Sequence, residues 1–378
     1  MKHALSALAV IILAAGSHAP AELIPHERDH KADSGRSLTP AAGRVDDPPY
    51  DLPHKLGLAR LYRKLDYTKK AENTYREILT QHPNCAEAHN GLGFLYENDG
   101  DYARAIKCYE RALEARPGWA RPTFHIGSCL LGQKRYKEAE NMLRTAAEVD
   151  PSDASPRNCL GILYARTNKP RAAEQEYRAA TAIRPDWVAP YWNLVLLYDA
   201  QGRYRESGEC LDAIMQIDPD NFDALYQRVK HLVGATDYSM AERTARKLVR
   251  LYPRRAGAHE ALGMAQWSRR ELRSAEASFA RALALKTDSA GAHLGMGHVR
   301  LWQKRYDEAE KNYRKALEID PGLADAQHAL EALAQKHQQE TRVGGGCSMA
   351  PGFARTSPLA LLQYLAVVLP ALMLRNRL

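Results

Sequence analysis

The sequence predicts an all-α solenoid, in which copies of one two-helix unit stack along a single chain. The first observation is a strict period of 34 residues in the middle of the chain, marked by prolines at 83, 117, 151, 185, 219, 253 and 321, with Thr287 in the one skipped place. The second is that small residues recur at two fixed places within this period. The third is the composition, since 45% of the residues are hydrophobic and 26% are charged, as in folded globular chains. A period of this length is typical of a helical hairpin that buries its apolar face against neighbouring copies of itself.

Eight units of 34 residues follow when the recurrent proline is placed at position 32 of each unit. Their predicted ranges are 52–85, 86–119, 120–153, 154–187, 188–221, 222–255, 256–289 and 290–323. The proline ends the second helix of the unit, because its ring is incompatible with a continuing helix. Residues 324–340 then repeat the pattern of a first helix without a second one, which predicts a capping helix.

Small residues mark the place where the two helices of a unit approach each other. Position 8 is glycine in five units, and position 20 is alanine in seven. We expect the two positions to face each other, as Gly161 and Ala173 would in the fourth unit. Position 24 is large in most units, and we expect it to fill the space between units. The sixth unit departs most from the pattern, with Arg228 at position 7 and Ala245 at position 24, and the eighth has Arg300 where tyrosine is usual.

Three stretches of the second unit carry a family resemblance. They are LGFLY at 92–96, DYARA at 101–105 and ERALEARP at 110–117. Together with the recurrent pattern over residues 52–323, they resemble the tetratricopeptide-repeat family. The resemblance implies a right-handed superhelix of eight repeats, with the first helix of each repeat on the inner wall of a concave groove. It also implies that the protein binds other proteins and is not an enzyme.

The resemblance further implies that positions 2, 5, 9, 12 and 13 of each repeat face this groove. Large apolar residues at these positions are the candidate partner-binding residues: Phe94, Phe124, Leu131, Ile162, Trp192, Leu196, Tyr226, Met264, Trp267, Leu301 and Trp302. Aromatic side chains often dominate interface energies, so we expect this set to bind an extended peptide or a partner helix. For each residue the alternative is packing against a neighbouring repeat. Trp119 and Trp187, at position 34, are expected to seal junctions between repeats.

Some members of the family hold a C-terminal carboxylate with lysine, arginine and asparagine side chains from consecutive first helices. The groove positions of this chain contain Asn90, Arg121, Asn158 and Lys230. These residues are too scattered along the chain for such a clamp, so binding of chaperone tails is not expected.

Other function classes find little support in the sequence. No nucleophile elbow, phosphate-binding loop or HExxH motif occurs, so we expect no catalytic residue, no cofactor and no metal. His89, His259 and His293 recur at position 4, where helix packing explains them better than catalysis. The net charge is +8, but the charges alternate in sign along the helices, so we expect no nucleic-acid binding. The six cysteines do not have the spacing of a zinc site.

The N-terminal residues predict export. A basic start is followed by an apolar stretch from Ala4 to Ala15, too short to span a bilayer, and small residues then favour cleavage after Ala21. We expect residues 1–21 to be a signal peptide, with an uncleaved anchor helix as the alternative. Residues 22–51 are polar and rich in proline, which predicts a flexible linker.

The C-terminal residues resemble a bacterial sorting tail. Residues 341–357 contain three glycines followed by Cys347, and residues 358–378 form a mostly apolar run with a basic end. The resemblance implies processing near Cys347 and transfer to an anchor, and a plain membrane anchor is the alternative. The terminal arginines place the repeats outside the cytosol if the tail spans a membrane.

These observations together predict an exported, membrane-associated protein of the bacterial cell envelope, in the periplasm or at the cell surface. Its expected function is to bind a protein or peptide ligand in the groove of the repeats. The alternative function is that of a structural scaffold for an envelope machine of secretion or surface-polymer assembly.

Overall fold

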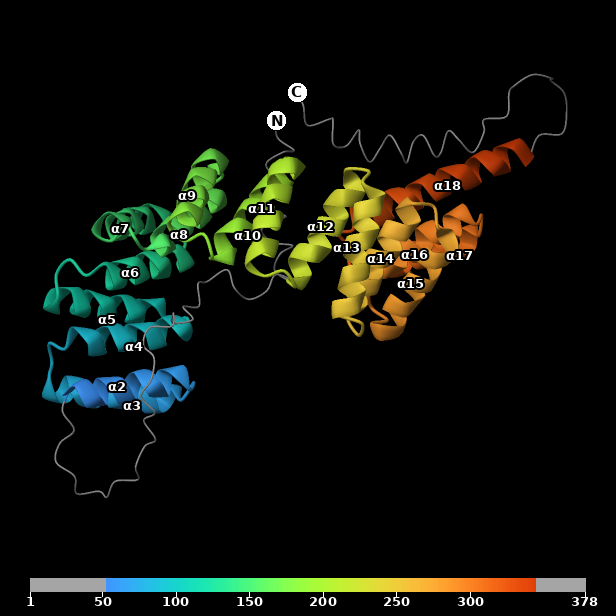
Figure 1. Cartoon of the computed structure of the whole chain (residues 1–378). Helices are drawn as coiled ribbons and strands as arrows, with labels where there is room; N and C mark the ends of the chain where they lie inside the picture. The colour runs from blue at the N-terminus through green and yellow to red at the C-terminus, as the bar shows by residue number, and fades with distance from the viewer. Residues whose placement is uncertain (1–51, 345–378) are drawn as a thin grey trace. The chain divides into compact units, whose positions relative to one another are not determined.

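A computed structural model describes residues 52–344, and every regular element in this range is an α-helix (Figure 1). The predicted all-α tetratricopeptide-repeat fold is therefore confirmed. The chain divides into two compact units, with the boundary between Ala200 and Gln201. This boundary falls inside the predicted repeat 188–221, so the two helices of that repeat belong to different units.

The first unit is a series of helical hairpins. Its helices are α2 (Leu52–Lys64), α3 (Thr68–Gln81), α4 (Ala86–Asn98), α5 (Tyr102–Ala115), α6 (Ala120–Gly132), α7 (Tyr136–Val149), α8 (Ala154–Arg166), α9 (Pro170–Ile183) and α10 (Val188–Ala200). From α2 to α9, each first helix packs on the second helix that follows it, and each second helix packs on the next first helix. The first helices α2, α4, α6, α8 and α10 also contact one another in succession, so they form a continuous wall, which we call the inner wall.

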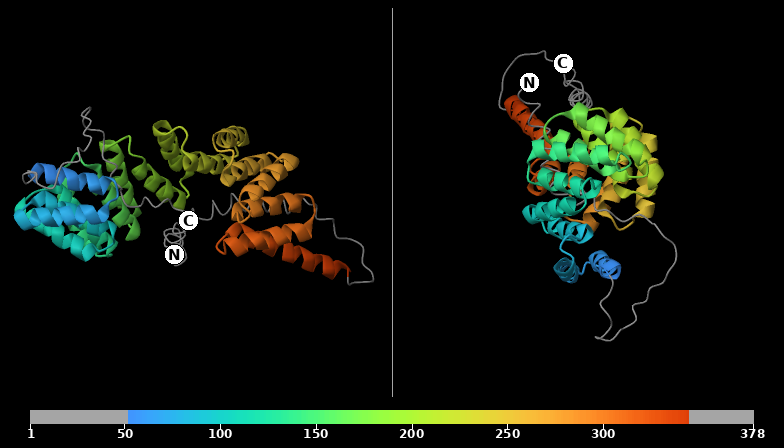
Figure 2. Two further views of the ribbon diagram at one scale, coloured as in Figure 1. Left: turned by 90° about the horizontal axis from the view of Figure 1, so that it is seen from below. Right: turned by 90° about the vertical axis from the view of Figure 1, so that its left-hand side faces the viewer.

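The second unit follows the same plan. Its helices are α11 (Tyr204–Ile217), α12 (Phe222–Gly234), α13 (Tyr238–Leu251), α14 (Ala256–Ser268), α15 (Leu272–Leu285), α16 (Ala290–Trp302), α17 (Tyr306–Ile319) and α18 (Ala324–Gly344). Here α12, α14 and α16 contact one another in succession, and α18 packs on α17 (Figure 2). The helix α18 begins where the capping helix is predicted to begin, and it continues four residues past the predicted end at 340.

The turn inside each hairpin depends on one residue in the left-handed backbone region. This residue stands at position 15 of every repeat: Asp66, Gly100, Lys134, Asn168, Gly202, Thr236, Arg270 and Lys304. In the second repeat, Gly100 N donates to Glu97 O at 3.0 Å and Asp101 N donates to Tyr96 O at 2.9 Å. These two bonds form a Schellman ending, which satisfies the last carbonyl groups of the first helix.

The glycine at position 8 makes room for the large residue at position 24 of the same repeat. A Cβ atom on Gly161 would lie 2.5 Å from ring atoms of Tyr177, well inside van der Waals contact. The side chain that comes nearest to Gly161 is therefore that of Tyr177, at position 24, and the expected approach of Ala173 stays a prediction. In the seventh repeat, the ring of Phe279 fills the space beside Gly263 and also beside Gly295 of the next repeat. The large residue thus packs both within its repeat and between repeats.

The sixth repeat solves the same packing problem with different residues. Val229 stands at position 8 and Ala245 at position 24, and both are fully buried in one apolar cluster. Arg228 lies over Gly208, and its guanidinium is 3.2 Å from the carboxylate of Asp212. The missing side chain of glycine leaves space for the arginine, which explains how a charged residue is accepted at position 7.

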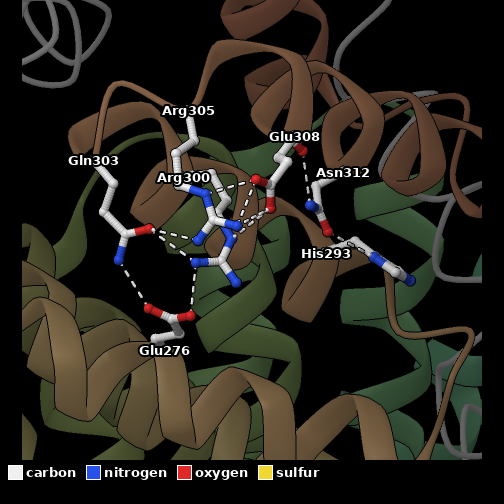
Figure 3. Close-up of polar contacts among 7 residues, drawn as sticks. All are labelled: Glu276, His293, Arg300, Gln303, Arg305, Glu308 and Asn312. Atoms are coloured by element: carbon white, nitrogen blue, oxygen red, sulfur yellow. Dashed lines mark hydrogen bonds and ion pairs between the residues drawn. The ribbon is translucent and has the colours of Figure 1, made fainter.

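The eighth repeat replaces a tyrosine contact with a direct ion pair. In the fourth repeat, the hydroxyl of Tyr164 donates to Glu140 of the preceding repeat at 2.8 Å. Arg300 holds the corresponding position in the eighth repeat, and its guanidinium lies 2.6 Å from Glu276, the counterpart of Glu140 (Figure 3). Gln303 donates to the same carboxylate at 2.8 Å. The junction between repeats is therefore kept although the tyrosine is lost.

The histidines at position 4 have a packing role, as predicted. The Nε2 atom of His89 lies 2.8 Å from the carbonyl oxygen of Pro83, and His259 makes the same contact with Pro253 at 2.9 Å. Gln327 of α18 repeats it with Pro321 at 2.8 Å. Each contact ties the start of a first helix to the turn that precedes it.

Candidate protein-binding site

The inner wall of the first unit contains a cavity of about 540 Å³ near its first repeats. Most of its lining comes from the first helices α2, α4 and α6. The lining residues are Gly57, Arg60, Leu61, Arg63, Lys64, Tyr75, Glu87, Asn90, Gly91, Trp119 and Arg121. A cavity of this size falls within the usual range for ligand sites.

The charge of the cavity is strongly one-sided. Its cations are Arg60, Arg63, Lys64 and Arg121, and its one carboxylate is Glu87. Glu87 also lies 3.6 Å from Arg116, outside the lining set. A concave surface lined mainly by positive charges concentrates the electrostatic field and attracts anionic groups.

Aromatic rings hold two arginines of this region in position. The guanidinium of Arg63 lies 4.6 Å from the centre of the Phe94 ring, and that of Arg116 lies 5.0 Å from Trp119. Such cation–π contacts restrain long side chains that otherwise sample many rotamers. The charged edge of the cavity is therefore partly preorganised.

Asn90 supplies an unused hydrogen-bonding group. Its Oδ1 atom is buried and accepts no hydrogen bond from the part of the chain that the structure describes. A buried acceptor without a donor is costly, and the side chain of Asn90 lines the cavity. The cavity thus combines cations with a side-chain amide.

The large apolar residues predicted for the groove lie elsewhere. None of the eleven lines this cavity. Phe124, Leu131 and Ile162 are only 4%, 6% and 6% exposed, so in the first unit they are part of the packed interior. Trp192 and Phe94 are partly exposed, and Leu196 is 44% exposed.

In the second unit, the predicted aromatic residues make contacts within the protein. The hydroxyl of Tyr226 donates to Glu260 at 2.6 Å, and Ser289 donates to the same carboxylate at 2.8 Å. Burial and the adjacent Glu260 raise the pKa of Tyr226 well above its ordinary value. Trp267 stacks on His298, with ring centres 5.2 Å apart.

The remaining predicted residues of the second unit are partly buried. The guanidinium of Arg270 lies 5.4 Å from the ring of Trp302. Met264 and Leu301 pack against two different apolar clusters. The structure therefore does not gather the predicted residues of this unit into one site.

The cations of α2 are not among the predicted binding residues, although their positions in the repeat indicate that they face the groove. Arg60, Arg63 and Lys64 stand at positions 9, 12 and 13 of the first repeat, which are groove positions by the rule used for the apolar residues. Asn90 and Arg121 line the same cavity, and the expectation that the four polar residues form no carboxylate clamp stays a prediction. Asn158 accepts a hydrogen bond from Asn193 at 2.9 Å, and Lys230 belongs to the second unit.

A buried polar cluster lies beside the Phe94 ring. Glu97 is 2.9 Å from Nδ1 of His125 and accepts a hydrogen bond from the hydroxyl of Tyr109 at 2.7 Å. Burial alone raises the pKa of Glu97, but the neighbouring His125 and the bond from Tyr109 lower it overall. The side chains of Glu97 and His125 are about nine-tenths buried, so this cluster connects α4, α5 and α6 and presents no open reactive group.

Residues 52–344 contain neither a metal-binding group of side chains nor a membrane-spanning helix. No group of three or more His, Cys, Asp or Glu side chains in this range is placed to hold a metal ion. Within the same range, no helix combines the length and apolar character needed to cross a bilayer. The predicted signal peptide, the linker, Cys347 and the apolar tail lie outside the described residues.

Comparison with solved structures finds several helical-repeat proteins at low identity. PilF of Pseudomonas aeruginosa is 22% identical, and the match covers 55% of this chain and 95% of that one, with a TM-score of 0.48. The Cut9–Hcn1 hetero-tetramer of the APC/C is matched at 16% identity over 70% of this chain and 52% of that one, with a TM-score of 0.46. MamA from Desulfovibrio magneticus is 18% identical over 45% of this chain and 97% of that one, with a TM-score of 0.39.

Family models give a more direct result. Five models, each described as a tetratricopeptide repeat, match residues 84–152, 130–198, 188–221, 226–290 and 290–323. These ranges cover nearly all of the predicted repeat region after its first repeat. Taken with the confirmed helical hairpins, they show that the chain belongs to the tetratricopeptide-repeat family.

Proposed function

We propose that this chain is a protein-interaction module whose first-unit cavity binds an acidic segment of a partner polypeptide. Tetratricopeptide repeats indicate an interaction scaffold and are typically not catalytic. The observation that carries the finer proposal is the cavity lined by four cations and one carboxylate. The large apolar residues support it less, because several of them are buried or bonded within the protein.

Recognition would combine three kinds of contact. Arg60 and Arg63 offer guanidinium groups, which bind carboxylates in a bidentate manner. Asn90 offers a side-chain amide to the peptide backbone. Leu61, which is 45% exposed, and Trp119 offer apolar surface at the edge of the cavity. An extended segment with alternating acidic and apolar residues fits this arrangement.

The test is a binding titration with a labelled peptide of alternating Glu and Leu, monitored by fluorescence anisotropy. We expect the double variant Arg60→Glu, Arg63→Glu to weaken binding by more than about tenfold, because the loss of hydrogen-bonded charge pairs costs this much or more. The matched control is Lys107→Glu, Arg171→Glu, two exposed cations of second helices. Equal losses in both variants, or equal binding of a peptide with Lys in place of Glu, would count against the proposal.

We also propose that the protein is exported to the bacterial cell envelope, supported by the sequences of residues 1–21 and 341–378. Intact-mass measurement of protein from its native host tests both ends. Cleavage near Ala21 and near Cys347 is expected, and Cys347→Ala should change the processing of the C-terminus. A mass that includes every residue through Leu378 would contradict sorting and leave a plain anchor.

A pull-down from the envelope fraction examines the scaffold alternative. One dominant partner that is competed away by the acidic peptide supports peptide recognition. A large assembly that the peptide does not displace, and that survives Arg60→Glu, supports a scaffold.

A further inference from the structure

The outer surface of the sixth repeat carries an unbroken row of cations. Arg243, Arg246, Lys247 and Arg250 stand on α13, and Arg254 follows it. The positions of Arg243, Arg246, Lys247 and Arg250 in the helical repeat place these four on one side of the helix, opposite the buried Ala241, Ala245 and Leu248. We call these five cations the basic face, and its helical part from Arg243 to Arg250 extends over about 10 Å at the rise of an α-helix.

Most of this charge is not neutralised by the protein. The one acidic residue of α13 is Glu242, which is only 3% exposed and is paired with Arg246 and Arg269. Lys247 lies 3.2 Å from Asp220. Within the described residues, Arg243, Arg250 and Arg254 have neither an ion pair nor a hydrogen bond from their guanidinium groups, and all three are exposed.

Equivalent surfaces in the other repeats are different. Position 29, which holds Arg250 in the sixth repeat, holds Glu114, Glu148 and Glu318 in the second, third and eighth. The helix α17 alternates acidic and basic residues, and Lys315 pairs with Glu318 at 2.7 Å. The fold therefore does not require a basic outer surface, and α13 is a local exception.

Two exposed apolar side chains accompany the cations. Met240 is 40% exposed and Leu251 is 38% exposed, and both lie next to the basic face along α13. They are eleven positions apart, about three helical turns, so they lie on the same side of the helix. The helix thus presents a row of cations edged by two apolar groups, the pattern of helices that lie on anionic lipid surfaces.

We propose that the basic face, with Met240 and Leu251, binds an anionic membrane surface. Each arginine near such a surface gains attraction from the lipid phosphates, and the two apolar side chains reach the boundary between headgroups and acyl chains. The exposed side of α13 has no aromatic residue on which a base of a single strand could stack. The exposed Met240 and Leu251 have no apolar counterpart along a phosphate backbone, so the surface is better suited to lipid. The inference is independent of the acidic-peptide cavity, which belongs to the first unit.

The test is flotation of the full chain with vesicles of phosphatidylcholine alone and with about one-third phosphatidylglycerol, the range in which surface charge attracts basic segments. The parent protein should bind the anionic vesicles at least about tenfold more strongly, because the attraction grows with each cation. Residues 358–378 include two arginines, so their contribution cancels only when the parent is compared with the variants described next. A ratio near one would overturn the proposal.

Variants then locate the surface. Arg243→Ser, Arg250→Ser, Arg254→Ser should reduce the preference for anionic vesicles by about tenfold or more. The control Lys107→Ser, Lys137→Ser, Arg171→Ser removes the same charge from exposed residues of second helices in the first unit, and it should change the preference less than about threefold if binding is local. Equal losses would show a general effect of net charge and overturn the assignment.

A last pair of measurements separates lipid from other polyanions. Met240→Ser, Leu251→Ser should weaken binding to anionic vesicles and leave retention on heparin unchanged, because only a bilayer has an apolar layer to receive these side chains. If the arginine variant loses binding to duplex DNA while vesicle binding stays that of the parent, the surface serves a nucleic acid and the proposal is wrong.

Discussion

The fourth repeat (154–187) packs Gly161 against Tyr177, whereas the sixth repeat (222–255) has Val229 and Ala245 at the same two positions. In both repeats the first helix has 13 residues and the second has 14. Both residues of each pair are buried. The packed core therefore constrains the combined volume of the pair more than the identity of either residue. A close-packed interior tolerates exchanges that conserve volume.

The outer surfaces of the same two repeats teach the complementary lesson. On α9, Glu174 pairs with Arg178 at 3.2 Å, and Glu176 pairs with Arg157 at 3.1 Å. On α13, the exposed charges are all positive. Surface charge contributes little to the stability of a helical hairpin, so it can differ between repeats and acquire a binding role.

The largest expected effect comes from emptying the large position of the fourth repeat. Tyr177→Ala should lower the free energy of unfolding of the first unit by about 3–5 kcal/mol, the usual cost of removing a buried aromatic ring. Tyr177 is 3% exposed, so the substitution leaves a cavity. Urea unfolding followed by amide hydrogen exchange of α8 and α9 measures the loss. A loss below 1 kcal/mol would mean that the ring is not well packed.

Filling the small position should cost less and should depend on the ring. Gly161→Val is expected to destabilise the unit by about 1–3 kcal/mol, because overpacking displaces neighbours. The double variant Gly161→Val, Tyr177→Ala copies the pair of the sixth repeat. It should lose less than the sum of the two single variants, with a coupling of about 0.5–3 kcal/mol. Strict additivity in this cycle would show that the two positions do not share space.

The sequence predicted the hairpins well and their internal contacts less well. The proline period locates the ends of the second helices, because the residue before a proline is driven out of the helical region. Arg116, with φ −141°, is an example. The period also marks positions 8, 20 and 24 as special, but spacing alone does not show which of them touch. The contact of Gly161 with Tyr177 depends on how the helices cross.

The candidate site was predictable only in part for a related reason. Arg60, Arg63 and Lys64 stand at positions that are expected to face the groove, but the expected anchors are large apolar residues. In a repeat protein the same apolar residues also hold neighbouring repeats together. Phe124 and Ile162 are therefore buried in the interior and are not exposed to a partner. The cations of α2 line the cavity and are not part of the packed interior, which makes them the clearer signal. The division of the repeat 188–221 between two units has no counterpart in the proline period.

A smaller effect is expected where the sixth repeat carries a charge at an apolar position. Arg228→Leu should change stability by no more than about 1 kcal/mol, because the ion pair with Asp212 is partly exposed and such pairs contribute little. The leucine restores the residue type that most repeats have at position 7. The comparison variant is Asp212→Ala, which leaves Arg228 over Gly208 without its carboxylate. Thermal melting of both variants is the measurement, and a loss above 2 kcal/mol for Arg228→Leu would show that the ion pair is essential to the repeat.

The smallest expected effect concerns the hairpin turn, where the fourth repeat has Asn168 and the sixth has Thr236. Both residues have positive φ, 58° and 62°, but asparagine tolerates this region far better than a β-branched residue does. Thr236→Gly should therefore raise stability by up to about 1 kcal/mol, since relief of the strained backbone exceeds the added flexibility of the unfolded chain. The hydrogen bond from Thr236 N to Val233 O, at 3.1 Å, involves only the backbone and is kept in the variant.

Asn168→Gly is the matched control, and it should change stability by less than about 0.5 kcal/mol because the strain it removes is small. Urea unfolding of the two variants side by side is the measurement. If Thr236→Gly destabilises the second unit, the side chain of Thr236 contributes to the turn and the two repeats differ more than their backbones indicate.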